Sequence, residues 1–179
     1  LLESPALNAR VKGRVLIKAE NLQRTGSFKF RGAWNCISRL TAETARGGVV
    51  AYSSGNHAQG VAAAAALMKL PALIVMPTDT PEIKKANTRS YGAEVVTYDR
   101  VSENREEIAG RIAKERGAVI VPPFEHPQII AGQGTTGLEP VAQAGERRAR
   151  LDAVLAPVRG GGPIAARFLA VTSPSPRAH

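Results

Sequence analysis

Cysteine and aromatic residues are scarce in this sequence. It contains a single cysteine, Cys36, and aromatic residues make up 4% of the chain. One cysteine excludes an internal disulfide framework and fits a reducing cytoplasm, where we expect Cys36 to act as a small apolar residue. No apolar run is long enough to cross a bilayer, and no signal-peptide pattern opens the sequence. We therefore expect a cytoplasmic protein that makes no membrane contact.

Acidic residues are few compared with basic ones. The sequence has 15 Asp and Glu residues and 24 Lys and Arg residues, which gives a formal net charge of +9. This excess raises the question of nucleic-acid binding, but the basic residues are scattered and stacking aromatic residues are few. We expect nonspecific attraction at most and no specific nucleic-acid partner. His126 and His179 have no metal-ligand spacing with cysteine or another histidine, so we expect no metal site.

The composition is sufficient for a folded core. The 179 residues, 44% hydrophobic and 22% charged, fit one ordinary domain or two small ones and exclude a disordered chain. Strands are expected at residues 15–19, 48–52, 72–76, 94–98, 118–121 and 153–156. Helices are expected at residues 57–70, 81–91 and 102–116, with helical sequence at 127–144 broken near 132–134. This alternation predicts an α/β fold with a parallel sheet and right-handed crossovers.

A lysine lies where the chain enters its first clearly periodic helix. Lys29 belongs to residues 25–33, TGSFKFRGA, which follow the apolar run at 15–19. The positive end of the helix dipole and the apolar neighbours Phe28 and Phe30 favour a neutral, nucleophilic amine. Such an amine can form a Schiff base with an aldehyde. The same pattern also fits a solvated surface lysine whose stem lies along the phenylalanines, and this stretch alone leaves both interpretations open.

A second candidate site follows the strand expected at residues 48–52. Residues 53–60 read SSGNHAQG and lead from that strand into a helix. The backbone N–H groups of such a turn, together with the helix dipole, can bind an anion. Gly55 permits close approach or a positive φ. The alternative is an ordinary serine-capped turn without a ligand.

Together the two stretches resemble one enzyme family. Residues 27–33, SFKFRGA, are similar to the cofactor-lysine motif of the threonine dehydratase and serine racemase family, which are pyridoxal-phosphate enzymes of fold type II. Residues 53–60 match a second motif of that family in the expected order. The similarity extends from Leu1 to about Ile164. On these motifs the chain is identified as a truncated member of the family.

The resemblance implies a division of the chain into two domains. Residues 48–144 would form a small open-sheet domain. Residues 1–47 and 145–179 would belong to an incomplete larger α/β cofactor domain, with the active site in the cleft between the two. Residues 168–179 lose helical periodicity, and we expect an irregular tail there. Full-length members commonly self-associate, so a homo-oligomer is the expectation for the full-length protein.

The resemblance also implies roles for residues at the cofactor. Lys29 would form the Schiff base with pyridoxal phosphate and, once displaced by the amino acid, would remove the α-proton. Phe28 would pack near the cofactor ring, although simple core packing explains it equally well. Ser54 corresponds to the serine that acts on the face opposite the lysine in the racemases.

The residues around Ser54 would hold the substrate. By resemblance, Ser53, Asn56 and His57 bind the substrate carboxylate, His57 mainly through its backbone. Asn56 would also contact the ring hydroxyl of the cofactor. We do not assign proton transfer to the His57 side chain.

A glycine-rich stretch occupies the place of the family's tetraglycine phosphate loop. By resemblance, Gly160, Gly161 and Gly162 would bind the cofactor phosphate through backbone amides. Two residues depart from the pattern. Arg159 stands where the first glycine is usual, and Pro163 removes an N–H group and constrains the preceding glycine.

These expectations point to one reaction class with two alternatives. The leading interpretation is a pyridoxal-phosphate-dependent serine/threonine dehydratase, an ammonia-lyase that converts a hydroxy amino acid into a 2-oxo acid and ammonium. The first alternative is an amino-acid racemase of the serine racemase type. The second is an inactive remnant that folds in part and takes up no cofactor.

Overall fold

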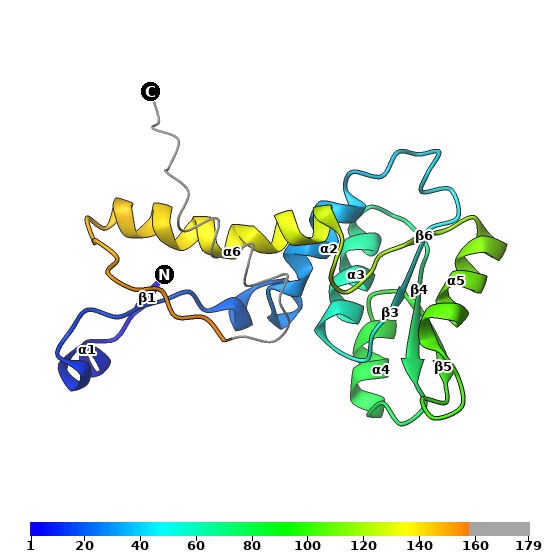
Figure 1. Ribbon diagram of the computed structural model, residues 1–179, viewed down its shortest axis with the longest axis horizontal. Helices are drawn as coiled ribbons and strands as arrows, with labels where there is room; N and C mark the ends of the chain where they lie inside the picture. Colours follow the sequence, from blue (N-terminus) through cyan, green and yellow to red (C-terminus); the bar gives the residue numbers. More distant parts are fainter. Residues whose placement is uncertain (158–179) are drawn as a thin grey trace.

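The structure is a computed structural model that describes residues 1–157, and one half of it is built around a parallel sheet (Figure 1). Its strands are β3 (Val49–Tyr52), β4 (Ala72–Pro77), β5 (Glu94–Tyr98) and β6 (Val119–Ile120). They lie in the order β5-β4-β3-β6 (Figure 1). Every neighbouring pair is parallel, which confirms the predicted α/β fold with a parallel sheet.

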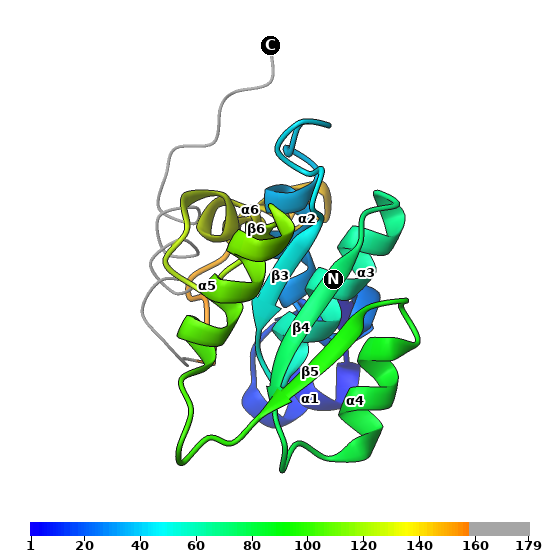
Figure 2. The same cartoon turned by 90° about the vertical axis from the view of Figure 1, so that its right-hand side faces the viewer.

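Helices connect these strands and cover both faces of the sheet. They are α3 (Asn56–Leu67), α4 (Glu82–Arg89) and α5 (Arg105–Arg116). α3 and α4 lie on one face and α5 on the other (Figure 2). Val49 and Ala51 are buried in the cluster on the α3 side, and Val50 in the cluster on the α5 side. Successive strand residues point to opposite faces, so a sheet covered on both sides is apolar at consecutive positions.

Local chemistry determines where α5 begins and ends. The Oδ1 of Asn104 accepts a hydrogen bond from the N–H of Glu106 at 2.8 Å, and Gly117 ends the helix with φ +64°. The sequence predicted a start at residue 102. The helix begins later because the Asp99 carboxylate accepts from the N–H of Val101 at 2.8 Å and holds these residues in a turn.

The remaining elements lie beside the sheet. They are β1 (Leu2–Glu3), α1 (Pro5–Val11), β2 (Leu16–Ile17), the 3₁₀ turns η1 (Glu20–Leu22) and η2 (Arg24–Gly26), α2 (Lys29–Ile37) and the long helix α6 (Pro127–Glu146). α2 packs against both α3 and α6 (Figure 1). It therefore connects the sheet with the half of the structure that contains α6 and the N-terminal segment, which includes the elements from β1 to η2.

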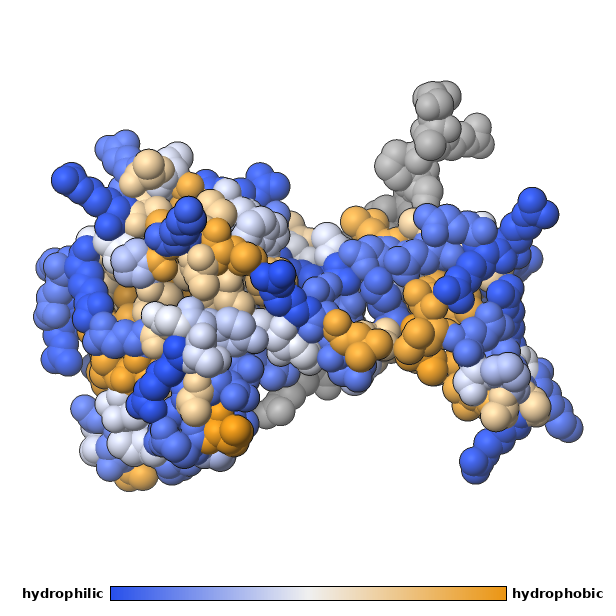
Figure 3. Space-filling model, turned by 180° about the vertical axis from the view of Figure 1, so that it is seen from behind, coloured by the Kyte–Doolittle hydropathy of each residue, from blue (hydrophilic) through white to orange (hydrophobic). Residues whose placement is uncertain are grey.

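The N-terminal segment has little apolar core of its own within residues 1–157. Exposed apolar side chains on it include Leu2, Val11, Ile17 and Leu22. Apolar patches are visible on this half of the surface (Figure 3). The sheet, in contrast, has a buried apolar cluster on each face. Most of the apolar stabilisation of the described residues therefore comes from the sheet and the helices against it.

Three sequence expectations were wrong in detail. The strand expected at residues 15–19 is only Leu16–Ile17, which pairs antiparallel with β1 outside the parallel sheet. The break expected near residues 132–134 is absent, because the glycine at 132 serves helix packing and α6 runs through it. Residues 153–156 form no strand within the described part of the chain, where they are mostly exposed.

Candidate active site

The sheet has a topological switch point between β3 and β6. The chain leads from β3 through α3 to β4, which lies on one side of β3. β6 comes later in the chain and lies on the other side of β3. In open α/β sheets, ligands bind in the crevice outside the carboxyl ends of strands at such a point. Two segments leave the sheet there: residues 53–55 after β3 and residues 121–123 after β6.

The side chain of Lys29 reaches this switch point. Lys29 is the first residue of α2, as the sequence predicted. Its Nζ donates a hydrogen bond to the carbonyl oxygen of Pro123 at 2.8 Å, just beyond β6. The same nitrogen lies 5.4 Å from the centroid of the Phe28 ring, within cation–π range. The amine is therefore held beside the carboxyl edge of the sheet and does not extend into solvent like an ordinary surface lysine.

The serine turn after β3 presents backbone donors at the same edge. The N–H of Gly55 donates to the Oγ of Ser53 at 3.2 Å, and Gly55 is the residue before the first turn of α3. Asn56 and His57 are the first two helical residues, whose N–H groups have no acceptor within an α-helix. Ser54 is partly exposed and Asn56 is exposed. This geometry suits binding of a carboxylate or another small anion.

A glycine brings the two stretches into contact. A Cβ on Gly60 would lie 3.2 Å from the backbone carbon of Lys29 and from the backbone nitrogen of Phe30. Helix α3 therefore lies against the backbone of the lysine itself. The sequence could not have predicted this contact from periodicity, because a glycine within an alanine-rich helix has no special pattern.

The His57 side chain is buried against the segment that follows β6. It is 2% exposed, and its Nε2 lies 2.9 Å from the carbonyl oxygen of Val121. Burial of the ring lowers the pKa of His57 to about 4. The buried ring leaves the backbone of His57 for the turn, and binding of a substrate by this backbone stays a prediction.

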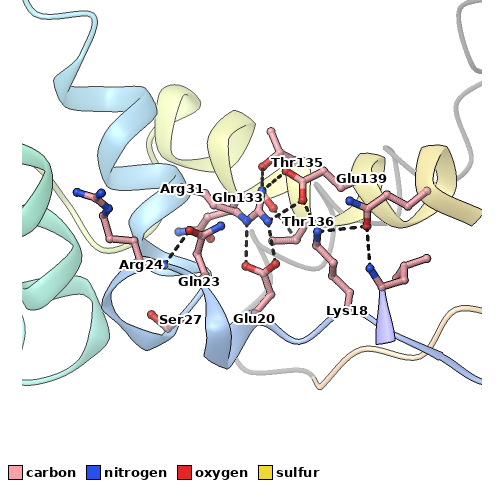
Figure 4. A network of polar contacts seen from close by, with 12 residues as sticks. Lys18, Glu20, Gln23, Arg24, Ser27, Arg31, Gln133, Thr135, Thr136 and Glu139 are labelled. Carbon is pink, nitrogen blue, oxygen red and sulfur yellow. Dashed lines mark hydrogen bonds and ion pairs between the residues drawn. The ribbon is translucent and has the colours of Figure 1, made fainter. Parts of the chain in front are cut away.

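An ion-pair network fixes α2 against α6, and the sequence analysis missed it. The guanidinium of Arg31 pairs with Glu20 at 2.8 Å and with Glu139 at 2.5 Å (Figure 4). Lys18 adds a second cation to Glu139 at 2.5 Å. These hydrogen bonds, chiefly from Arg31, lower the pKa of Glu139 to about 2. The only sequence signal was an arginine two residues after the candidate lysine; its partners are distant in sequence.

The described residues fit pyridoxal phosphate in two respects. An amine suited to the cofactor aldehyde lies at the switch point, and N–H groups suited to the carboxylate of an amino acid begin α3. The predicted phosphate-binding residues Gly160, Gly161 and Gly162 lie outside the described residues. Within residues 1–157, no group of three or more His, Cys, Asp or Glu side chains could hold a metal ion. In the same range no helix is both long and apolar enough to cross a membrane.

Known proteins with similar sequences include an ammonia-lyase and a serine racemase. The chain is 50% identical over 173 residues to the L-threo-3-hydroxyaspartate ammonia-lyase of Pseudomonas sp, which covers 97% of the chain and 53% of the relative. It is 42% identical over 170 residues to the serine racemase of Schizosaccharomyces pombe, covering 95% of the chain and 51% of that protein. The chain thus spans about half the length of the curated relatives it matches.

A solved structure and a family description agree with these relatives. The crystal structure of a threonine deaminase from T.th. superposes with a TM-score of 0.89 at 50% identity, over 98% of this chain and 56% of that one. The fold is therefore that of the fold-type II pyridoxal-phosphate enzymes. Residues 1–178 match the family described as "PALP: Pyridoxal-phosphate dependent enzyme". The chain belongs to this family of pyridoxal-phosphate-dependent enzymes.

Proposed function

We propose that the protein is an ammonia-lyase of the serine/threonine dehydratase type, acting on amino acids that carry a β-hydroxyl group. One observation supports this most directly: the amine of Lys29 lies at the switch point, in a helix that contacts the serine-turn helix at Gly60. An amine and an anion site at one edge of a sheet are the two features that an amino acid linked to an aldehyde cofactor requires.

In this proposal the residues of the chain bind, orient and move protons. The amine of Lys29 would hold the cofactor, and its Nζ would accept the α-proton of the substrate. Ser53 and the N–H groups of Asn56 and His57 orient the substrate carboxylate. Bound pyridoxal phosphate supplies an electron sink for the bonding pair left behind at the α-carbon. Phe28 lies beside the amine and would pack against the cofactor ring.

Two further contacts complete the proposed cofactor site. Asn56, exposed at the start of α3, would donate to the ring hydroxyl of the cofactor. Gly160, Gly161 and Gly162 would bind its phosphate through backbone amides.

The proposed reaction is balanced without an oxidant. The substrate loses its α-hydrogen and its β-hydroxyl group together as one water molecule. The unsaturated amine that is released takes up one water molecule and yields a 2-oxo acid and ammonium. Serine, threonine and 3-hydroxyaspartate all carry the required α-hydrogen and β-hydroxyl. Because the Pseudomonas relative is named for 3-hydroxyaspartate, that compound should be tested as a third substrate.

A racemase is the second candidate. Ser54 lies in the same turn as the proposed carboxylate site and is partly exposed, and a serine racemase is among the relatives. Racemisation needs a second proton-transfer group on the face opposite Lys29, and the hydroxyl of Ser54 would serve there. Formation of D-serine from L-serine distinguishes this reaction from dehydration, which yields a 2-oxo acid.

The first experiment is a visible absorption spectrum of the purified chain mixed with pyridoxal phosphate. We expect a protein-dependent band that is lost in Lys29→Ala and kept in Lys84→Ala, since Lys84 is an exposed lysine on α4. Two assays follow. One measures the formation of 2-oxo acid from serine, threonine and 3-hydroxyaspartate, and the other measures the formation of D-serine from L-serine. Spectra identical to free cofactor in all variants would reject the enzyme proposal and favour a remnant that binds no cofactor.

The assembly, location and domain division of the protein also stay predictions. We propose a cytoplasmic protein whose full-length form is a homo-oligomer. The division into residues 1–47, 48–144 and 145–179 can be tested by limited proteolysis, which should cut first near residues 47 and 144 if the domains move separately.

A further inference from the structure

His57 reaches one segment with its backbone and another with its side chain. Its N–H group begins α3 at the proposed carboxylate site. The residue is 2% exposed, and its Nε2 lies 2.9 Å from the carbonyl oxygen of Val121, just beyond β6. A single residue therefore connects the segments that leave the sheet on either side of the switch point.

The segment it contacts has few other backbone anchors. The N–H of Val121 donates to the carbonyl of Val50 at 2.8 Å, which is the last sheet hydrogen bond of this segment. Pro122 and Pro123 follow, and proline has no N–H group to donate. At these two prolines the backbone can form hydrogen bonds only through its carbonyl oxygens. The carbonyl of Val121 meets His57, and that of Pro123 accepts from Lys29 at 2.8 Å.

The contact requires one tautomer of the ring. A carbonyl oxygen only accepts, so the hydrogen of the neutral imidazole must be on Nε2. Nδ1 then has a lone pair, and it is buried with no hydrogen-bond partner. A ring used only to fill space would gain nothing by burying a polar nitrogen, because an unsatisfied buried group costs free energy. The ring is therefore retained for its Nε2–H group.

We propose that His57 is a positioning residue whose Nε2–H donates a hydrogen bond to the carbonyl of Val121. Because Pro122 and Pro123 follow directly, this bond also keeps the carbonyl of Pro123 in place to accept a hydrogen bond from the Lys29 amine. His57 thus aligns the lysine with the serine turn through a buried side chain whose Nε2 lies next to the Val121 carbonyl. The relevance of this inference to catalysis rests on the proposed function, but its test does not.

Two substitutions separate the hydrogen bond from the volume of the ring. Glutamine carries an amide N–H at about the reach of Nε2, whereas the asparagine side chain is too short to reach Val121. Both leave the backbone N–H of residue 57 in place. The readout is the rate at which acetic anhydride acylates Lys29 in the cofactor-free 179-residue chain, measured by mass spectrometry. Exposed Lys84 in the same sample is the internal standard.

The expected result is faster acylation when the anchor is lost. With the Pro123 carbonyl displaced, Lys29 loses a hydrogen bond to its protonated form, and H57N should raise its acylation rate at least about fivefold. H57Q should stay within about twofold of the wild type, because its amide restores the bond. A folded H57N with the wild-type rate would overturn the proposal, and so would an H57Q protein that behaves like H57N.

A measurement on the unsubstituted chain decides the matter if H57N does not fold. In ¹³C,¹⁵N-labelled protein at pH 7, NMR should find the ring neutral, protonated on Nε2, and coupled across the hydrogen bond to the Val121 carbonyl. Protonation on Nδ1 or on both nitrogens contradicts the proposal. Neither test uses pyridoxal phosphate, so a chain that shows the anchor but takes up no cofactor would retain this inference and lose the proposed function.

Discussion

The Nζ of Lys29 lies 2.8 Å from the carbonyl oxygen of Pro123, which is 94 residues further along the chain. Two close helix contacts position α2, and with it Lys29, for this hydrogen bond: α2 packs on α3 at Gly60 and on α6 at Gly132. Because each contact depends on the absence of a side chain, each can be tested with a single methyl group.

Gly60→Ala should disturb the lysine directly. The new Cβ would lie 3.2 Å from the backbone carbon of Lys29, so α2 must move by a few tenths of an ångström. We expect the free energy of unfolding in urea to fall by about 1 kcal/mol. Gly110→Ala, in α5 with open space around it, should instead raise it by about 0.5–1 kcal/mol. Equal effects of the two substitutions would show that the close approach at Gly60 has no energetic consequence.

Gly132→Ala should separate α6 from α2. A Cβ there would lie 2.5 Å from the carbonyl oxygen of Arg31 and 2.8 Å from the Cα of Gly32, and backbone atoms cannot rotate away. We expect a loss of about 2–3 kcal/mol of stability, measured by urea unfolding. Gly145→Ala, near the end of the same helix with nothing within 4 Å, is the matched control and should be neutral or stabilising. A stable Gly132→Ala protein would argue against the close crossing of α2 and α6.

Arg31→Ala should destabilise the junction of α2, α6 and the N-terminal segment. The Arg31 side chain is 10% exposed and faces two carboxylates, Glu20 and Glu139, which its loss would leave without their main partner. We expect a decrease of about 2–3 kcal/mol in unfolding free energy, with partial recovery in Arg31→Lys, which keeps the charge but not the planar fork.

The control for Arg31 is an exposed ion pair of similar length. Arg116 pairs with Glu94 at 2.8 Å, but both side chains are about half exposed. Arg116→Ala should cost less than about 1 kcal/mol. If the two arginines prove equivalent, the network in Figure 4 has no special stabilising role.

Stability should decline as the pH falls below about 6.5, because of His57. The pKa of His57 is lowered to about 4 in the folded chain, so in that interval the unfolded chain binds a proton that the folded chain does not. The free energy of unfolding should drop by about 1 kcal/mol per pH unit between pH 6 and 4. H57Q has no titrating ring and should lack this slope. An identical slope in both proteins would assign the pH dependence to other groups.

Glu139 affects the free energy of unfolding in a lower pH range. Its pKa is lowered to about 2, so its contribution is present above its ordinary pKa of 4.5 and is lost as the pH falls through about 2. Since the carboxylate is 39% exposed, solvent screens much of the pairing. Unfolding measured at pH 6 to 5 therefore reports on His57 with little interference from the network.

Much of the fold follows from short-range features of the sequence. Consecutive apolar residues such as Val49 and Val50 predict a strand buried on both faces, and the alternation with helices predicts a parallel sheet. The position of Lys29 at the start of a helix was also predictable. Gly132 misled the prediction, because a glycine within a helical pattern fits both a break and a close helix crossing.

The sequence by itself determined the α/β class, the helix that begins at Lys29, the serine turn at the start of α3 and the resemblance to one enzyme family. Only the tertiary structure decided that β6 lies beside β3, that Lys29 meets Pro123, and that His57 anchors Val121 from 64 residues away. The physical reason is the range of the interactions. Helix and strand patterns come from neighbours a few residues apart, whereas strand order and contacts between loops depend on how whole elements share one core.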